Sequence, residues 1–195
     1  MKKYYLVLFL FLLINGCSKN SVNWYNNSLE NALANAENKI IMIDFYTDWW
    51  YACNLLDANT FSDQKISKYL NQNFINIKID ADTEYGQKLF ADFNGLGYPL
   101  LLFLDSKKNE LERLYGFFES EQFIQKLMDI KNGINTFPIL QAQFESGDNS
   151  AETMFMLASK YAERENDSLA TLLYQNVIIS KNVSSKMFFE AKYFI

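Results

Sequence analysis

The chain of 195 residues has no histidine, only two cysteines and only two prolines. Without histidine, catalysis by Ser-His-Asp or Cys-His pairs is excluded, as are zinc sites that use histidine, and we expect no metal or other cofactor. The formal net charge is −5 with no basic cluster, so nucleic acid is not an expected partner. Hydrophobic residues make up 49% of the chain, which favours a packed globular core over disorder.

The first residues have the layout of a signal peptide. Two lysines follow Met1, and an unbroken apolar run covers residues 4–14. A bilayer-spanning helix needs about 20 apolar residues, so this run is too short to span a membrane. A basic start followed by a short apolar run indicates an exported protein.

The end of the apolar run resembles the lipobox of bacterial lipoproteins. Ile14, Gly16 and Cys17 fit that motif, whereas Asn15 is a less usual residue there. The resemblance implies a signal peptide at residues 1–16, a lipidated tether at 17–27, and attachment to a membrane of the bacterial cell envelope, facing the periplasm or the exterior. The alternative is an ordinary secretory signal in which Cys17 occurs by chance.

Residues 28–130 alternate between helical and strand patterns. A continuous apolar run at 40–46, interrupted only by Asp44, predicts a central strand covered on both faces. Further strands are expected at 74–80, 100–105 and 110–116, and helices at 28–36, from the residues after Cys53 to Ala58, and at 62–70, 84–93 and 120–128. This order predicts a three-layer α/β fold with a central mixed sheet.

The segment from Ile40 to Cys53 resembles the active-site strand and loop of thioredoxins. In that superfamily a buried aspartate ends the strand and a Trp-Cys-x-x-Cys motif follows. Asp44 matches the aspartate and Trp49 the tryptophan, which places Trp50 at the nucleophilic cysteine and Cys53 at the resolving cysteine. An indole cannot attack a disulfide, so the motif is degenerate.

Other positions carry the same resemblance across residues 24–130, closest to periplasmic thiol:disulfide interchange proteins. Trp24 and the segment 60–63 match those proteins, and Lys78 falls where a lysine lies near the buried aspartate. Gly97-Tyr98-Pro99 matches the loop whose proline is cis in the family and exposes a backbone edge to bound peptides. The resemblance implies that Trp49, Tyr98 and Pro99 contact a peptide, and we expect Trp50, Tyr51 and Tyr98 to gather there.

Asp44 and Cys53 each have two interpretations. In active family members the buried aspartate moves a proton at the second cysteine, and burial raises its pKa. Here Asp44 either remains from a lost activity or is a polar core residue supported by Lys78. Cys53 either acts as a single thiol or is a small buried apolar residue, and the second interpretation is favoured.

Residues 134–195 predict a helical segment with spacing similar to a tetratricopeptide repeat. Leu157 and Ala158 fit the large and small positions of a first helix, and Ala170 and Tyr174 fit a second. A plain helical hairpin packed on the domain is an equal alternative. The last residues continue an apolar helical pattern, so we expect the chain to be a piece of a longer repeat protein.

Two function classes remain open. The first is a membrane-anchored, redox-degenerate thioredoxin-like protein that binds peptide or protein partners. The second is a periplasmic thiol-disulfide oxidoreductase or protein-disulfide reductase that serves cell redox homeostasis. Residue 50 discriminates between them, and Trp50 favours the first.

Overall fold

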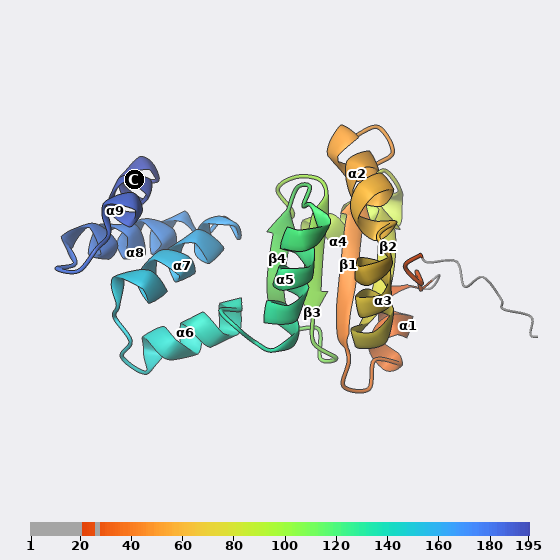
Figure 1. Ribbon diagram of the computed structural model, residues 1–195, viewed down its shortest axis with the longest axis horizontal. Helices are drawn as coiled ribbons and strands as arrows, with labels where there is room; N and C mark the ends of the chain where they lie inside the picture. The colour runs from red at the N-terminus through yellow and green to blue at the C-terminus, as the bar shows by residue number, and fades with distance from the viewer. Residues whose placement is uncertain (1–20, 26–27) are drawn as a thin grey trace, which may run out of the picture.

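The computed structural model describes residues 21–25 and 28–195 (Figure 1). The signal peptide, Cys17 and most of the tether lie outside the described residues. Within the described part, no helix combines the length and apolar character needed to cross a bilayer.

A four-stranded mixed sheet lies at the centre of the first part of the chain. Its strands are β1 (Ile40–Tyr46), β2 (Phe74–Asp80), β3 (Leu100–Leu104) and β4 (Glu110–Tyr115). They lie in the order β2-β1-β3-β4, with β1 parallel to β2 and the other two neighbouring pairs antiparallel. The predicted α/β architecture is therefore confirmed.

Helices cover both faces of this sheet, which explains the apolar runs of β1 and β3. On one face α1 (Leu29–Ala34) and α4 (Glu84–Asp92) pack against Ile41, Ile43 and Phe45. On the other face α3 (Gln64–Asn73) and α5 (Ser120–Lys131) pack against Met42. Since side chains alternate along a strand, Asp44 lies on the same face as Met42.

The helices after β1 differ in their bounds from the sequence prediction. α2 (Tyr51–Leu55) continues directly into η1 (Leu56–Phe61), a stretch of π-helix, so helical structure runs past Ala58. α3 begins after Asp63, two residues later than expected. The Asp63 carboxylate accepts hydrogen bonds from the backbone N–H groups of Lys65 and Ile66 at 2.7 and 3.2 Å, which fixes this start.

The C-terminal helices form a lobe beside β4. They are α6 (Phe137–Glu145), α7 (Ala151–Ala162), α8 (Asp167–Ile179) and α9 (Ser185–Tyr193). Figure 1 shows this lobe extending away from the sheet on the β4 side. Pro138 lies in the first turn of α6, where proline fits a helix.

The core of the lobe lies mainly between α7 and α8. Leu157 and Ala158 of α7 share it with Ala170 and Tyr174 of α8. These are the four positions that the repeat spacing singled out. A helical hairpin packed on the sheet domain would bury the same residues, so the tetratricopeptide assignment remains a prediction.

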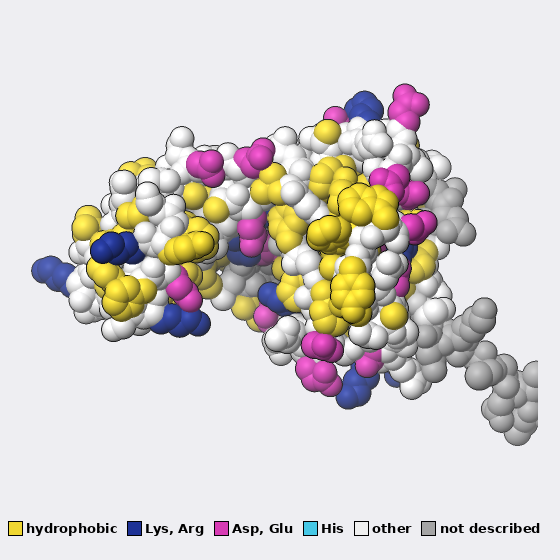
Figure 2. Space-filling model, turned by 90° about the horizontal axis from the view of Figure 1, so that it is seen from above, with side chains coloured by type: hydrophobic (Ala, Val, Ile, Leu, Met, Phe, Trp, Pro, Cys, Tyr) yellow, Lys and Arg dark blue, Asp and Glu magenta, His cyan; other side chains and the backbone are white. Residues whose placement is uncertain are grey.

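A group of charged side chains joins the lobe to β4. Arg113 is 3% exposed, and its guanidinium donates to both carboxylate oxygens of Glu110 at 2.7 and 2.6 Å and to the Glu163 carbonyl at 3.1 Å. Arg164 Nη2 lies 2.5 Å from Glu110 Oε1, and Lys160 forms an ion pair with Glu112. In the view of Figure 2, basic and acidic side chains meet at the waist between the two lobes.

The opposite edge of the sheet is bordered by residues 21–25. Trp24 forms a parallel bridge with Asn76 of β2, and the Tyr25 N–H donates to the Asn76 carbonyl at 2.7 Å. The Trp24 ring packs edge-on against Phe61, with centroids 5.0 Å apart. This short segment therefore lies beside β2 and contacts η1.

Candidate functional site

The start of α2 positions the residues that resemble the redox motif. Trp50 is the N-cap of α2, and its carbonyl accepts a hydrogen bond from the Cys53 N–H at 3.1 Å. Cys53 therefore lies one turn further along the helix. The sequence resemblance assigns Trp50 to the position of the attacking thiol. An indole therefore lies there, at the N-terminus of α2.

Three consecutive aromatic side chains are exposed at this end of the molecule. The exposed fractions are 64% for Trp49, 46% for Trp50 and 73% for Tyr51. The two indoles pack edge-to-face, with ring centroids 5.8 Å apart. Trp49 Nε1 donates a hydrogen bond to Asp82 Oδ2 at 2.8 Å. Figure 2 looks down on the α2 end and shows hydrophobic side chains gathered over the sheet lobe. We call Trp49, Trp50 and Tyr51 the aromatic patch.

The Tyr98–Pro99 peptide bond is cis, as the resemblance implied. The Pro99 carbonyl accepts a hydrogen bond from the Gly116 N–H at 3.0 Å, which ties this loop to the end of β4. Tyr98 packs against Phe90, with ring centroids 4.6 Å apart and ring planes tilted by 37°, rather than against the aromatic patch. Burial raises the pKa of Tyr98, and the negative charge of Asp82 raises it further.

Cys53 is a shielded thiol. Only 3% of the residue is exposed, and no disulfide involves it. Burial raises its pKa, and the carboxylates of Asp44 and Asp57 raise it further. Since the thiolate is the reactive species, this environment suppresses its nucleophilicity.

Asp44 is a buried carboxyl group next to Lys78. Burial raises its pKa to about 7, with Lys78 opposing the shift and Asp57 adding to it. The strand register pairs Asp44 with Lys78 across β1 and β2, and Nζ lies 3.6 Å from Oδ2. The other oxygen, Oδ1, has no hydrogen-bond partner among the described residues. The group can therefore hold or release a proton near neutral pH.

Asp57 completes this charged group, and it was not predicted from the sequence. Its carboxylate forms an ion pair with Lys78, whose Nζ also lies 4.5 Å from the centroid of the Tyr46 ring. The available signal was spacing, because Asp57 follows Cys53 by four residues and so lies on the same face of the helix. The structure thus brings Asp44, Asp57 and Lys78 together beside Cys53.

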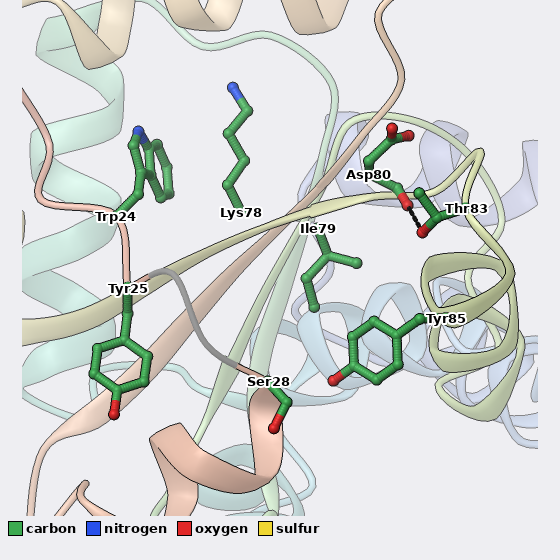
Figure 3. Close-up of a pocket in the computed structure, with 8 residues that line it drawn as sticks. All are labelled: Trp24, Tyr25, Ser28, Lys78, Ile79, Asp80, Thr83 and Tyr85. Atoms are coloured by element: carbon green, nitrogen blue, oxygen red, sulfur yellow. Dashed lines mark hydrogen bonds between the residues drawn. The ribbon is translucent and has the colours of Figure 1, made fainter.

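An open hollow of about 570 Å³ lies along the β2 edge (Figure 3). Trp24 and Lys78 lie at one side of it, and Tyr25 and Tyr85 lie at another. The Thr83 hydroxyl donates to the Asp80 carbonyl at 2.7 Å at its rim. Among residues 21–25 and 28–195, no group of His, Cys, Asp or Glu side chains is arranged to hold a metal ion.

Two solved structures are similar to the sheet domain in fold. A thioredoxin from Thermus thermophilus is 25% identical, with a TM-score of 0.50 over 56% of this chain and 87% of that one. A putative disulphide-isomerase from Bacteroides thetaiotaomicron is 28% identical, with a TM-score of 0.50 over 58% of this chain and 93% of that one.

Curated relatives include thiol:disulfide interchange protein DsbD. The protein from Yersinia pestis is 38% identical over 104 residues, and that from Actinobacillus pleuropneumoniae is 34% identical over 103 residues. These matches cover 52% and 51% of this chain but only 18% of each relative. The chain therefore spans less than a fifth of the length of the curated relatives that it matches.

A family model matches residues 11–143, which is more than half of the chain and includes the strand, loop and cis-proline described above. The model is that of the Thioredox_DsbH family, described as "Protein of unknown function, DUF255". The match also extends into α6, beyond the end of the sheet domain. The chain belongs to this thioredoxin-like family, which lies close to the thiol:disulfide interchange proteins.

Proposed function

We propose that this protein binds extended segments of partner proteins at the edge formed by Pro99 and the aromatic patch, without exchanging disulfides at position 50. The observation that carries the proposal is the half-exposed indole of Trp50 at the start of α2. Exposed aromatic side chains beside a backbone edge are good anchors for a peptide, because each buries a large area with few torsions to order.

The chemistry around Cys53 supports binding rather than turnover. Disulfide exchange begins when an accessible thiolate attacks a substrate disulfide and forms a mixed disulfide. Trp50 has no thiol, and Cys53 is buried with a raised pKa. A substrate disulfide held at the aromatic patch would therefore meet no reactive sulfur.

The second candidate is a thiol-disulfide oxidoreductase, with Cys53 acting as a single thiol and Asp44 as its proton acceptor. Two observations favour this candidate. The first is the sequence identity to thiol:disulfide interchange proteins, and the second is the buried carboxyl group of Asp44, whose pKa is raised to about 7. Such a carboxyl group is suited to taking a proton from a neighbouring thiol.

The proposed location is the bacterial cell envelope, with the protein held on a membrane through a lipid at Cys17 and facing the periplasm or the exterior. The support is the apolar run followed by the Leu13–Cys17 motif. A stable anchor of this kind needs more than one acyl chain.

Insulin reduction with dithiothreitol as electron source tests the two candidates. We expect no acceleration by the unchanged protein, and partial activity in Trp50→Cys because that variant restores the dithiol. Cys53→Ser is the control for activity that depends on the remaining thiol. Robust turnover by the unchanged protein that disappears in Cys53→Ser would favour the oxidoreductase.

Binding is measured separately by fluorescence anisotropy with labelled extended peptides that lack cysteine. Trp49→Ala and Trp50→Ala should each weaken binding about tenfold. Phe189→Ala removes an aromatic side chain that is 69% exposed on α9 and should leave binding unchanged. Equal loss in all three variants, or none in any, would contradict the proposed site.

A further inference from the structure

Arg113 is a buried arginine whose guanidinium binds to parts of the fold that are far apart in the sequence. Its Nη2 donates to the Phe93 carbonyl at 2.9 Å, and its Nη1 donates to the Asn94 carbonyl at 3.2 Å. Nη1 also donates to the Glu163 carbonyl at 3.1 Å and to the Tyr115 hydroxyl at 3.2 Å. One side chain of β4 thus contacts both the end of α4 and the end of α7.

Both of these helix ends attract the positive charge. Phe93 is the C-cap of α4 and Glu163 is the C-cap of α7. The last carbonyl groups of a helix have no partner within the helix, and the helix dipole stabilises a cation beside them. The Glu110 carboxylate balances the charge, since it accepts from Arg113 Nε and Nη2 at 2.7 and 2.6 Å. A single guanidinium therefore joins the two helices.

The end of α4 leads directly into the cis-proline loop. Residues 93–99 connect α4 to β3. At the start of this loop, Arg113 binds two consecutive backbone carbonyls. At its end, the Pro99 carbonyl accepts a hydrogen bond from the N–H of Gly116, the residue that follows β4. Both ends of the loop are thus tied to β4 and its next residue, and the first tie uses the guanidinium that also contacts the lobe.

The docked lobe keeps water away from Arg113, which is only 3% exposed. Lys160 of α7 forms an ion pair with Glu112 of β4. Just after α7, Arg164 Nη2 lies 2.5 Å from Glu110 Oε1. Hydrogen bonds shielded from water are stronger than those for which water competes. If the lobe moved away from β4, water would reach the guanidinium and weaken its bonds to the start of the loop.

We propose that Arg113 is a positioning residue for the peptide edge, through which docking of the lobe on β4 fixes the cis-proline loop in the conformation that binds a partner segment. Peptide binding at Pro99 and docking of the lobe are then coupled, and each strengthens the other by the same factor. The inference rests on the proposed function, and it names the element that regulates the binding site.

The first test compares peptide affinity between variants of the full chain. Arg164→Met removes the ion pair with Glu110, and Arg164 forms no hydrogen bond or ion pair with the described residues 94–99. Anisotropy with the cysteine-free peptides should show about fivefold weaker binding, because coupling between two sites commonly changes affinity by about that factor or more. Lys186→Met removes an exposed lysine of α9 and should leave the affinity unchanged.

Arg113→Lys tests the positioning role directly. Lysine keeps a positive charge beside Glu110, but one ammonium group cannot replace the fork of donors that reaches both helix ends. We expect binding about fivefold weaker than in the unchanged protein. Combining Arg113→Lys with Arg164→Met should weaken binding no further, because both variants remove the same connection. Two losses that multiply in the double variant would overturn the inference.

The reciprocal effect is measured in the unchanged protein and needs no variant that folds. The Lys160 side chain is 17% exposed while it pairs with Glu112, whereas that of Lys186 is 83% exposed. Saturating peptide should slow acetylation of the Lys160 amine about fivefold, because it favours the docked lobe, and should leave the rate at Lys186 unchanged. Mass spectrometry gives both rates. An equal rate at Lys160 with and without peptide would overturn the inference.

Signals from the loop separate this inference from the proposed function. Without peptide, Arg164→Met should shift the NMR amide signals of Tyr98 and Gly116. The indole signal of Trp24, which lies at the opposite border of the sheet, should stay unchanged. If no peptide binds but the loop signals shift, the proposed function fails and the connection between lobe and loop stands. If peptides bind through Trp50 with the same affinity in the unchanged protein and in Arg164→Met, the inference fails alone.

Discussion

Lys78 Nζ lies 3.6 Å from Asp44 Oδ2 inside the domain, although it forms its closer ion pair with Asp57. Lys78 thus pairs with two carboxylates, that of Asp44, which is buried, and that of Asp57, which is partly exposed. The buried one is left with an oxygen that has no hydrogen-bond partner among the described residues. This arrangement explains why burial outweighs the attraction of Lys78 in setting the pKa of Asp44.

Asp44 should make folding stability fall as the pH rises from about 4 to about 7. Its pKa is 3.8 in the unfolded chain and about 7 in the folded state, so the folded state binds the extra proton in this range. Asp44→Asn should remove the decline and be more stable than the unchanged protein at pH 8. The gain should be up to about 4 kcal/mol, because each tenfold difference in proton affinity corresponds to about 1.4 kcal/mol.

Urea unfolding at a series of pH values measures this difference. Asp92→Asn is the control, because Asp92 pairs with Lys88 on the surface and should leave the pH profile unchanged. An advantage of Asp44→Asn that does not depend on pH would mean that the carboxyl group is already ionised in the fold at low pH.

Trp50 should be accessible to solvent and contribute little to stability. With 46% of the residue exposed, Trp50→Ala should cost less than about 2 kcal/mol, whereas truncating a core tryptophan costs about 3–5 kcal/mol. Acrylamide quenching of tryptophan fluorescence, compared between the unchanged protein and Trp50→Phe, measures the accessibility. A Trp50 contribution shielded from the quencher would identify it as a plug of the site.

Removing Arg113 should detach the helical lobe from β4. Arg113→Met removes a hydrogen-bond donor from the carbonyls of Phe93, Asn94 and Glu163, and breaking a buried ion pair costs about 3–5 kcal/mol. Hydrogen exchange should then increase in α7 before it increases in β1. Lys88→Met removes a surface ion pair instead and should change stability by less than about 1 kcal/mol.

Cys17 should determine the partition of the protein between membrane and soluble fractions. In a bacterial host, we expect the unchanged protein in the membrane fraction, because lipidation requires the thiol. We expect Cys17→Ser either in the soluble fraction or as a precursor that keeps its signal peptide. Fractionation with globomycin, which blocks lipoprotein signal cleavage, provides a second measurement. Identical partition of both proteins would contradict the lipoprotein interpretation.

Much of the fold was predictable because its determinants are local. The apolar run at 40–46 and the alternation at 74–80 gave the bounds of β1 and β2 without error. The cis bond at Pro99 followed from the family resemblance. The individual helix α6 was not predicted, because Pro138 suggests a break unless the residues before it are known to start a helix.

The less predictable features depend on residues far apart in the sequence. Arg164 pairs with Glu110, and Lys160 with Glu112, across about fifty positions. Neither pair has a spacing that distinguishes it from ordinary surface charge, so the docking of the lobe on β4 could not be predicted from the sequence. Asp57 was not predicted for a different reason. Its spacing from Cys53 is visible in the sequence, but its partner Lys78 lies on β2.

The segment beside β2 has a consequence for how the protein behaves at high concentration. A sheet with a free outer strand can add strands from neighbouring molecules, which leads to aggregation. Trp24 and Tyr25 occupy part of the β2 border at Asn76, and the charged side chains of Glu110 and Arg113 lie on the other outer strand, next to the helical lobe. Both borders of the sheet thus carry features that disfavour strand addition by a neighbouring molecule.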